Sequence, residues 1–101
     1  MLLIRRLVWD SNNVAHIARH EMLPEDVGDL CQGRPLFEAG KLGRLLVFGP
    51  ASDGRMVTAV LDATDEPGVY YVVTARPASR RERRMYAEQT QGGEKQDGGK
   101  G

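Results

Sequence analysis

The feature that most constrains the fold is a run of three strand-like segments, at residues 44–48, 55–62 and 69–76. The links between them, 50–54 and 65–68, contain the Pro, Asp and Gly residues that are typical of turns. Because short glycine-containing links return the chain directly beside itself, we expect the three segments to form an antiparallel sheet. The last segment is apolar or aromatic on both faces, which favours a central position in that sheet.

The rest of the chain adds one more strand and three helices. Residues 2–8 have strand composition, and the cap-forming residues 10–13 that follow predict a helix at 12–20. A proline suited to a first helical turn predicts a second helix at 24–32, and a capping-box signature starts a third at 79–89. This order predicts an α+β fold: an antiparallel sheet of about four strands with two helices from the N-terminal half and one C-terminal helix.

Length and composition indicate one globular domain. A chain of 101 residues, 41% hydrophobic and 28% charged, closes a single core, which we place at residues 1–89. Residues 90–101 contain no apolar side chain, so we expect a flexible tail there. The lone Cys31 cannot form an internal disulfide, and the short apolar start is interrupted by arginines. These features favour a cytoplasmic protein that does not span a membrane.

Positive charge is concentrated near the C-terminal helix although the net charge is zero. Five of the fourteen basic residues lie between Arg76 and Arg84. Arg80 and Arg81 fall in the first helical turn, where the helix dipole disfavours positive charge. Arg80 and Arg84 also form a like-charge pair four residues apart, and the two effects together destabilise the helix by on the order of 0.5 to 1 kcal/mol. An anionic partner, either a phosphate backbone or an acidic protein, would offset this cost. The alternative is a solvated helix face with internal glutamate partners.

Three motifs occur in an order that resembles the BrnT family of toxins, over residues 8–88. They are Trp9-Asp10 followed by Arg19-His20 and Pro24-Glu25; Gly43-Arg44 through Gly49; and Thr74-Ala75-Arg76 followed by Arg80-Arg81-Glu82-Arg83-Arg84 and Tyr86. The chain differs from the family pattern at three places. Tyr71 stands where an arginine is frequent, Asn12 and Asn13 replace a lysine, and His16 replaces an asparagine.

The resemblance implies a RelE-like fold and metal-independent cleavage of RNA, without a cofactor. It also implies an antitoxin partner, usually a small DNA-binding protein. Cleavage needs an acid, a base and cations. His20 is the candidate acid or base, because imidazole changes protonation near neutral pH, although it could instead only cap its helix. The predicted catalytic set is His20, Arg76, Arg80, Glu82 and Tyr86, and the predicted phosphate-binding set is Arg44, Arg81, Arg83 and Arg84.

Other interpretations stay open. His16 and His20 have metal-ligand spacing, but a zinc site needs three or four ligands and Cys31 is the only soft group nearby, so no metal is predicted. The aromatic residues at 9, 70, 71 and 86 could stack bases, yet aromatic residues beside strands more often belong to the core. The scaffold could also serve as a non-enzymatic interaction or nucleic-acid-binding module. Monomer, homodimer and toxin–antitoxin complex are all compatible with the sequence.

Overall fold

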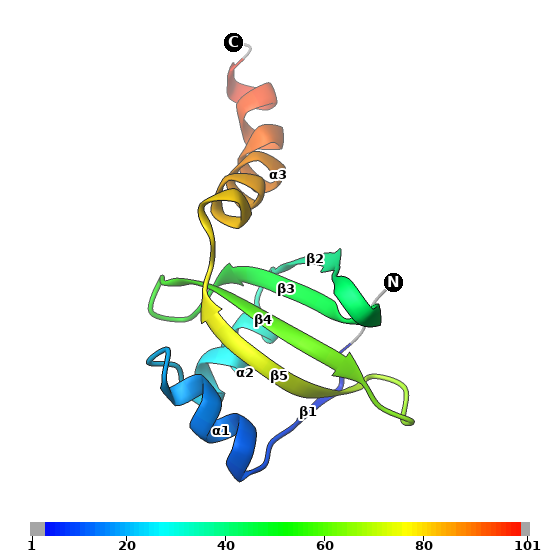
Figure 1. Cartoon of the computed structure of the whole chain (residues 1–101). Helices are drawn as coiled ribbons and strands as arrows, with labels where there is room; N and C mark the ends of the chain where they lie inside the picture. The colour runs from blue at the N-terminus through cyan, green and yellow to red at the C-terminus, as the bar shows by residue number, and fades with distance from the viewer. Residues whose placement is uncertain (1–3, 100–101) are drawn as a thin grey trace.

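The computed structural model describes the backbone of residues 4–99 and the side chains of residues 4–90. The fold is α+β, as the sequence predicts: two helices follow the first strand, four strands come next, and a helix ends the chain (Figure 1). The strands are β1 (Arg6–Val8), β2 (Leu36–Ala39), β3 (Leu45–Pro50), β4 (Met56–Ala63) and β5 (Val69–Pro77). The helices are α1 (Ser11–Ala18), α2 (Pro24–Gln32) and α3 (Arg80–Gly99), with a short 3₁₀ helix, η1 (Lys41–Gly43).

The sheet is mixed, so the prediction of about four antiparallel strands was wrong. In the described residues five strands form one sheet in the order β1-β5-β4-β3-β2. Strand β1 runs parallel to β5, with Arg6 opposite Val69, whereas the other pairs are antiparallel. A parallel pair is possible here because β1 is joined to the rest of the sheet through α1 and α2 and not through a tight hairpin, which would force an antiparallel pair. The unexpected strand is β2, whose four residues pair with β3.

The starts of α1 and α2 follow the local signals in the sequence. The Asp10 side chain accepts a hydrogen bond from the Asn13 backbone N–H (2.9 Å), and the Asn13 side chain accepts one from the Asp10 N–H (2.8 Å). The Asn13 amide also donates to the backbone oxygens of Val8 and Val72, which ties α1 to both parallel strands. Helix α2 has the predicted bounds, and α1 ends at Ala18, two residues before the predicted end.

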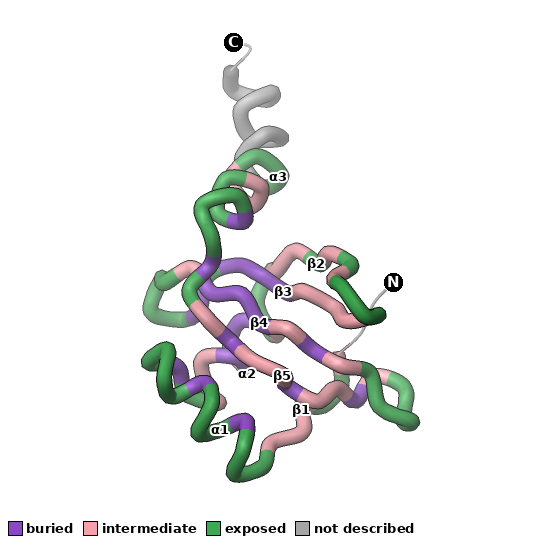
Figure 2. The backbone as a smooth tube through the Cα atoms, viewed as in Figure 1, coloured by how far each residue is buried: buried purple, intermediate pink, exposed green. Residues whose placement is uncertain are grey.

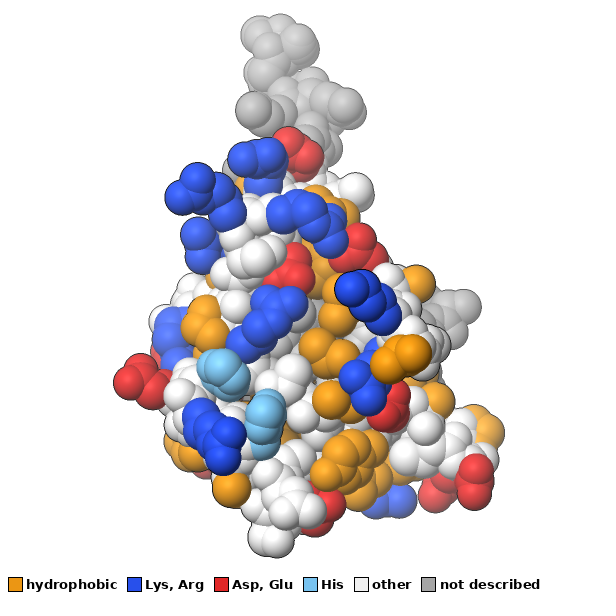
Figure 3. All heavy atoms as spheres, in the orientation of Figure 1, with side chains coloured by type: hydrophobic (Ala, Val, Ile, Leu, Met, Phe, Trp, Pro, Cys, Tyr) orange, Lys and Arg blue, Asp and Glu red, His pale blue; other side chains and the backbone are white. Residues whose placement is uncertain are grey.

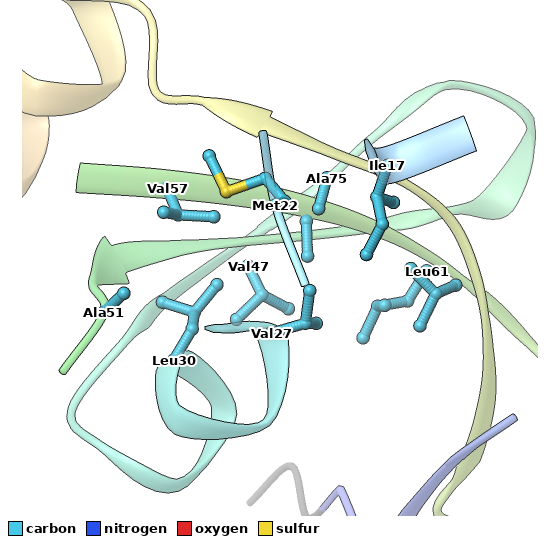
Figure 4. Packing of buried hydrophobic residues seen from close by; sticks show 11 residues of the cluster. Ile17, Met22, Val27, Leu30, Val47, Ala51, Val57, Leu61 and Ala75 are labelled. Atoms are coloured by element: carbon cyan, nitrogen blue, oxygen red, sulfur yellow. The ribbon is translucent and has the colours of Figure 1, made fainter. Parts of the chain in front are cut away.

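The main core lies between one face of the sheet and the two N-terminal helices. Figure 4 shows Ile17 of α1 with Val27 and Leu30 of α2 packed toward Val47 and Leu61 of the strands. All five side chains are fully buried, and Figure 2 shows unbroken buried stretches in β3 and β4, where α3 also covers the other face, and separate buried positions along β5. The covered face therefore holds the apolar contacts that stabilise the fold.

The opposite face of the sheet, which we call the second face, is less covered. By register it carries three cross-strand rows: Phe48, Thr58 and Arg76; Leu46, Val60 and Thr74; and Asp62 with Tyr71. A β-bulge lies in β5 opposite the Val60–Leu61 step. The extra residue changes the side-chain alternation, so Tyr71 and Thr74 share a face although they are an odd number of positions apart.

Helix α3 covers only one end of the second face. Figure 1 shows it leaving the end of β5 and projecting away from the sheet. Helix α3 continues to Gly99, beyond the predicted end at residue 89. The side chains from residue 91 on lie outside the described residues, so the flexibility of 90–101 stays a prediction. In the described part of the chain, none of the helices combines the length and apolar character that crossing a membrane requires.

Candidate functional site

The best-defined polar contact of the second face is the pair formed by Arg76 and Glu82. The two guanidinium nitrogens of Arg76 lie 2.9 and 3.0 Å from the two carboxylate oxygens of Glu82. The Glu82 carboxylate also accepts hydrogen bonds from the Thr58 hydroxyl (2.7 Å) and from the Ser79 backbone N–H (2.8 Å). Glu82 is 4% exposed. The start of α3 is thus fixed to β4 and β5 through one buried carboxylate.

These contacts determine the protonation of Glu82. The Arg76 hydrogen bonds, together with those from Ser79 and Thr58, lower the pKa of Glu82 to about 2. The same pairing raises the pKa of Arg76. A carboxylate that binds protons so weakly is a poor general base at neutral pH. The geometry instead gives Glu82 the task of holding Arg76, whose side chain remains 34% exposed.

Glu82 also completes the predicted capping box. Its backbone N–H donates to the Ser79 hydroxyl oxygen at 3.1 Å while its side chain accepts from the Ser79 N–H. This reciprocal pair is the signature that the sequence shows at the start of the third helix. One glutamate therefore caps α3 and pairs with Arg76.

The other arginines of α3 divide into two groups. Arg81 pairs with Glu38 of β2 at 2.8 Å, and Arg83 donates to the Ala78 backbone oxygen at 3.1 Å. Arg80 and Arg84 are exposed and form no ion pair within the described residues. Their positive charges at the start of a helix are therefore available to an external anion.

His16 of α1 and His20 of the turn after α1 lie beside one another on the surface. The rings of His16 and His20 meet edge to face, with centroids 6.0 Å apart. Both residues are exposed, as the sequence predicts, while Ile17 of α1 is buried in the core. Figure 3 shows the two histidines on one face of the molecule, with basic side chains near them and a further basic group around the first turns of α3.

Two further candidate residues make local contacts. The Tyr86 hydroxyl donates to the Arg34 backbone oxygen at 2.8 Å. Its ring lies so close to Gly49 that a Cβ there would be 3.1 Å from Cε1. These contacts make Tyr86 an anchor for α3. Arg44 pairs with Asp62 of β4 at 3.1 Å on the second face.

The aromatic residues differ in what they contact. Trp9 and Tyr70 pack against the main core, as predicted. The Tyr71 hydroxyl donates to both carboxylate oxygens of Asp10, at 3.2 and 3.1 Å. Burial and then the Asp10 contact raise the pKa of Tyr71, so its phenol stays protonated at neutral pH. Tyr71 supports the cap of α1, and a base-stacking role has no contact in its favour.

The thiol of Cys31 is similarly inert. The side chain is half-buried against the main core. Burial raises the pKa of Cys31 to about 11, so the thiolate is scarce at neutral pH. Among the described residues no group of three or more His, Cys, Asp or Glu side chains could hold a metal ion.

The predicted residues meet in three places. Arg76 and Glu82 bond directly, the histidines form a pair on α1 and the turn after it, and Arg44 and Arg81 line one hollow on the second face. The remaining lining of the hollow was not foreseen: Glu38, Ala39, Gly40, Lys41, Leu46 and Val60. The sequence signal that points to it is a Lys-Leu pair between two glycines at 40–43. Comparison of the sequence with known protein-family models and with curated proteins gives no match.

Proposed function

We propose that this protein is a metal-independent endoribonuclease of the BrnT toxin type, which acts on RNA in the cytoplasm and is neutralised by a DNA-binding antitoxin. The observation that carries the proposal is the exposed pair His16 and His20, on a molecule that also presents unpaired arginines at the start of α3. Imidazoles supply an acid and a base at neutral pH, and guanidinium groups bind phosphate.

The proposed reaction is an internal transfer within the RNA. One imidazole, in its neutral form, accepts the proton of a ribose 2′-hydroxyl, and the 2′-oxygen attacks the adjacent phosphorus. The bond from phosphorus to the 5′-oxygen breaks, and the second imidazole, protonated, donates its proton to that oxygen. The products are a 2′,3′-cyclic phosphate and a free 5′-hydroxyl. Two adjacent exposed histidines, one on α1 and one in the turn that follows it, suit these two proton transfers.

The cations on the same molecule support binding of the phosphate backbone. Arg80 and Arg84 have no carboxylate partner within the described residues, so each can release counterions from RNA when it binds a phosphate. The positive charge of Arg76 is partly neutralised by its ion pair with Glu82, so Arg76 contributes less to phosphate binding. Its side chain is nevertheless partly exposed, which leaves the guanidinium accessible to a phosphate oxygen. Glu82 and Tyr86 act by positioning Arg76 and α3.

Cleavage of a labelled single-stranded RNA in the presence of EDTA tests the proposal. The parent is expected to cleave, and His20→Ala and His16→Ala are each expected to lose about a hundredfold in rate, the usual contribution of a general acid or base. Val14→Ala, which removes an exposed side chain from the same helix, is the matched control and should cleave like the parent. A 2′-deoxy substitution at the cleaved position should block the reaction.

A second arm uses messenger RNA on a translating ribosome, to test whether cleavage depends on the ribosome. Cleavage in that arm alone, lost in the histidine variants, supports the same active site. Intact RNA in both arms, with the parent folded, rejects the ribonuclease.

The second candidate function is a non-catalytic nucleic-acid-binding module on the same scaffold. The Arg76–Glu82 pair favours it, because the most central arginine is already neutralised by a buried carboxylate. This candidate predicts RNA binding that depends on salt concentration, without cleavage. Arg80→Ala should lower the magnitude of the slope of log binding constant against log salt concentration by about one, because one phosphate contact is lost. Arg6→Ala, at the opposite edge of the sheet, is the control and should leave the slope unchanged.

A further inference from the structure

The second face contains a hollow of about 590 Å³ between η1, strands β2, β3 and β4, and the first turn of α3. This volume is within the range of small-molecule sites in proteins, about 300 to 1,000 Å³. Leu46 and Val60, direct cross-strand neighbours, are apolar members of its lining. Glu38, Gly40, Lys41, Arg44 and Arg81 line the rest together with one alanine.

The charge of the hollow favours an anion. Lys41, Arg44 and Arg81 supply three positive charges and Glu38 one negative charge, a balance of +2 for the lining. Arg81 is engaged by Glu38, and Arg44 by Asp62. Lys41 is exposed and has no ion pair within the described residues. Among the described residues the hollow therefore offers the unpaired Lys41 ammonium beside the guanidinium groups of Arg44 and Arg81, whose carboxylate partners are partly exposed.

The loop beside the hollow is held in an unfavourable conformation. Leu42, next to Lys41, has φ 61° and ψ 29°, a left-handed conformation that a leucine rarely adopts. Its side chain is 83% exposed, so no packing within the chain explains why a leucine is placed there. Backbone strain without a structural benefit is typical of segments that contact a ligand. Leu42 does not itself line the hollow, but Lys41 and Arg44 on either side of it do. A ligand that fills the hollow and extends past η1 would bury the Leu42 side chain.

We propose that this hollow binds a single unpaired nucleotide of RNA. The base lies against Leu46 and Val60, and Leu42 covers it from the edge. Its phosphate binds Lys41, with Arg44 nearby. An apolar pocket bordered by charged groups matches a nucleotide, which joins a flat aromatic base with apolar faces to a compact phosphate anion. The inference deepens the function proposed above and rests on it for the RNA source of the nucleotide.

Binding of adenosine 5′-monophosphate to the full chain, followed by methyl and amide NMR, tests the inference. The nucleotide is expected to shift the methyl signals of Leu46 and Val60, whereas inorganic phosphate at the same concentration is not. Lys41→Glu should weaken nucleotide binding about fivefold to tenfold, which is what one lost charge-assisted contact gives. Arg6→Glu makes the same charge change at the opposite edge of the sheet and should have no effect.

A second variant separates binding from folding. Leu42→Gly removes the exposed side chain and relieves the backbone, so it should keep the fold and still weaken nucleotide binding. The inference is overturned if adenosine 5′-monophosphate leaves both methyl groups unmoved, or if phosphate alone moves them equally. It is also overturned if a peptide of alternating glutamate and leucine shifts them and the nucleotide does not.

The outcomes distinguish this inference from the proposed function. Nucleotide binding in the hollow, together with RNA that stays intact in both cleavage arms, rejects the ribonuclease and keeps the pocket. Cleavage that depends on the histidines, together with unmoved methyl groups, keeps the ribonuclease and rejects the pocket.

Discussion

The two faces of the sheet differ in how deeply their side chains are buried. On the face covered by α1 and α2, the central side chains are apolar and fully buried, as Leu30 and Val47 illustrate. On the second face, Leu46 and Val60 are only half-buried, and their neighbours include the ion pairs of Arg76 and Arg44. Burial stabilises a fold in proportion to apolar area removed from water, so the first face should control stability and the second should tolerate change.

The largest expected effect comes from a matched pair of leucine truncations. Leu30→Ala leaves a cavity in the closed core and should lower the free energy of unfolding by about 3 kcal/mol. Leu46→Ala, on the second face, removes a side chain that is already partly in water and should cost about 1 kcal/mol. Urea denaturation measures both. Equal losses would mean that the second face is closed as tightly as the first, which would contradict the comparison.

The end of the second face under α3 is closed, since Phe48 and Thr58 are fully buried there, and the buried Glu82 carboxylate beside them has an effect that depends on pH. The pKa of Glu82 is about 2 in the folded chain and 4.5 ordinarily, so unfolding takes up a proton between these values. The ionised Glu82 side chain therefore makes its full contribution to the free energy of unfolding above about pH 5, and this contribution is lost as the pH falls toward 2. Glu82→Gln should therefore cost on the order of 2 kcal/mol at pH 7 and much less at pH 3.

The matched control for this prediction is Glu38→Gln, which breaks the exposed pair with Arg81. Surface ion pairs contribute at most about 1 kcal/mol, so this variant should stay near the parent at every pH. Thermal or urea unfolding from pH 3 to pH 7 gives the comparison. A Glu82→Gln variant whose deficit does not shrink with falling pH would show that the carboxylate does not anchor α3 in this way.

A smaller effect is expected where Tyr86 fixes α3 to the turn before β2. Tyr86→Phe removes the hydrogen bond to the Arg34 backbone oxygen and keeps the ring against Gly49. A single hydrogen bond of this kind is worth about 1 kcal/mol. Hydrogen exchange of the α3 amides should accelerate in the variant while the amides of α2 stay protected. Unchanged exchange in α3 would mean that the hydroxyl contributes nothing to its docking.

The local rules in the sequence predicted helix starts well and sheet topology poorly. The caps of α1 and α3 and the bounds of α2 follow from short-range patterns, which involve residues three or four positions apart. Strand β2 and the parallel direction of β1 depend on contacts between distant segments, and β1 has only three residues. The bulge in β5 was also invisible, because one extra residue changes which face each side chain takes without changing composition.

The candidate site was predicted with the same limitation. The basic residues of α3 were found because they break helix rules, but the sequence did not reveal that Glu82 pairs with Arg76. Its place in the capping box was the available signal, since a glutamate that caps a helix is already engaged. The hollow was missed because its residues come from segments far apart in the chain, joined only by the pairing of β2, β3 and β4.

The smallest expected effect is a rise in the free energy of unfolding, at Leu42. It tests whether this residue serves a ligand and not the stability of the fold. Leu42→Gly replaces a left-handed leucine with the residue that adopts this conformation freely, so the relief of strain should exceed the added entropy of the unfolded chain. We expect the free energy of unfolding to rise by about 0.5 kcal/mol, measured by urea denaturation. Val14→Gly is the control, since Val14 is also exposed but lies inside helix α1, where glycine is unfavourable, and it should be destabilised. If Leu42→Gly loses stability like the control, then Leu42 contributes contacts to the fold itself, and the reason for assigning it to a ligand disappears.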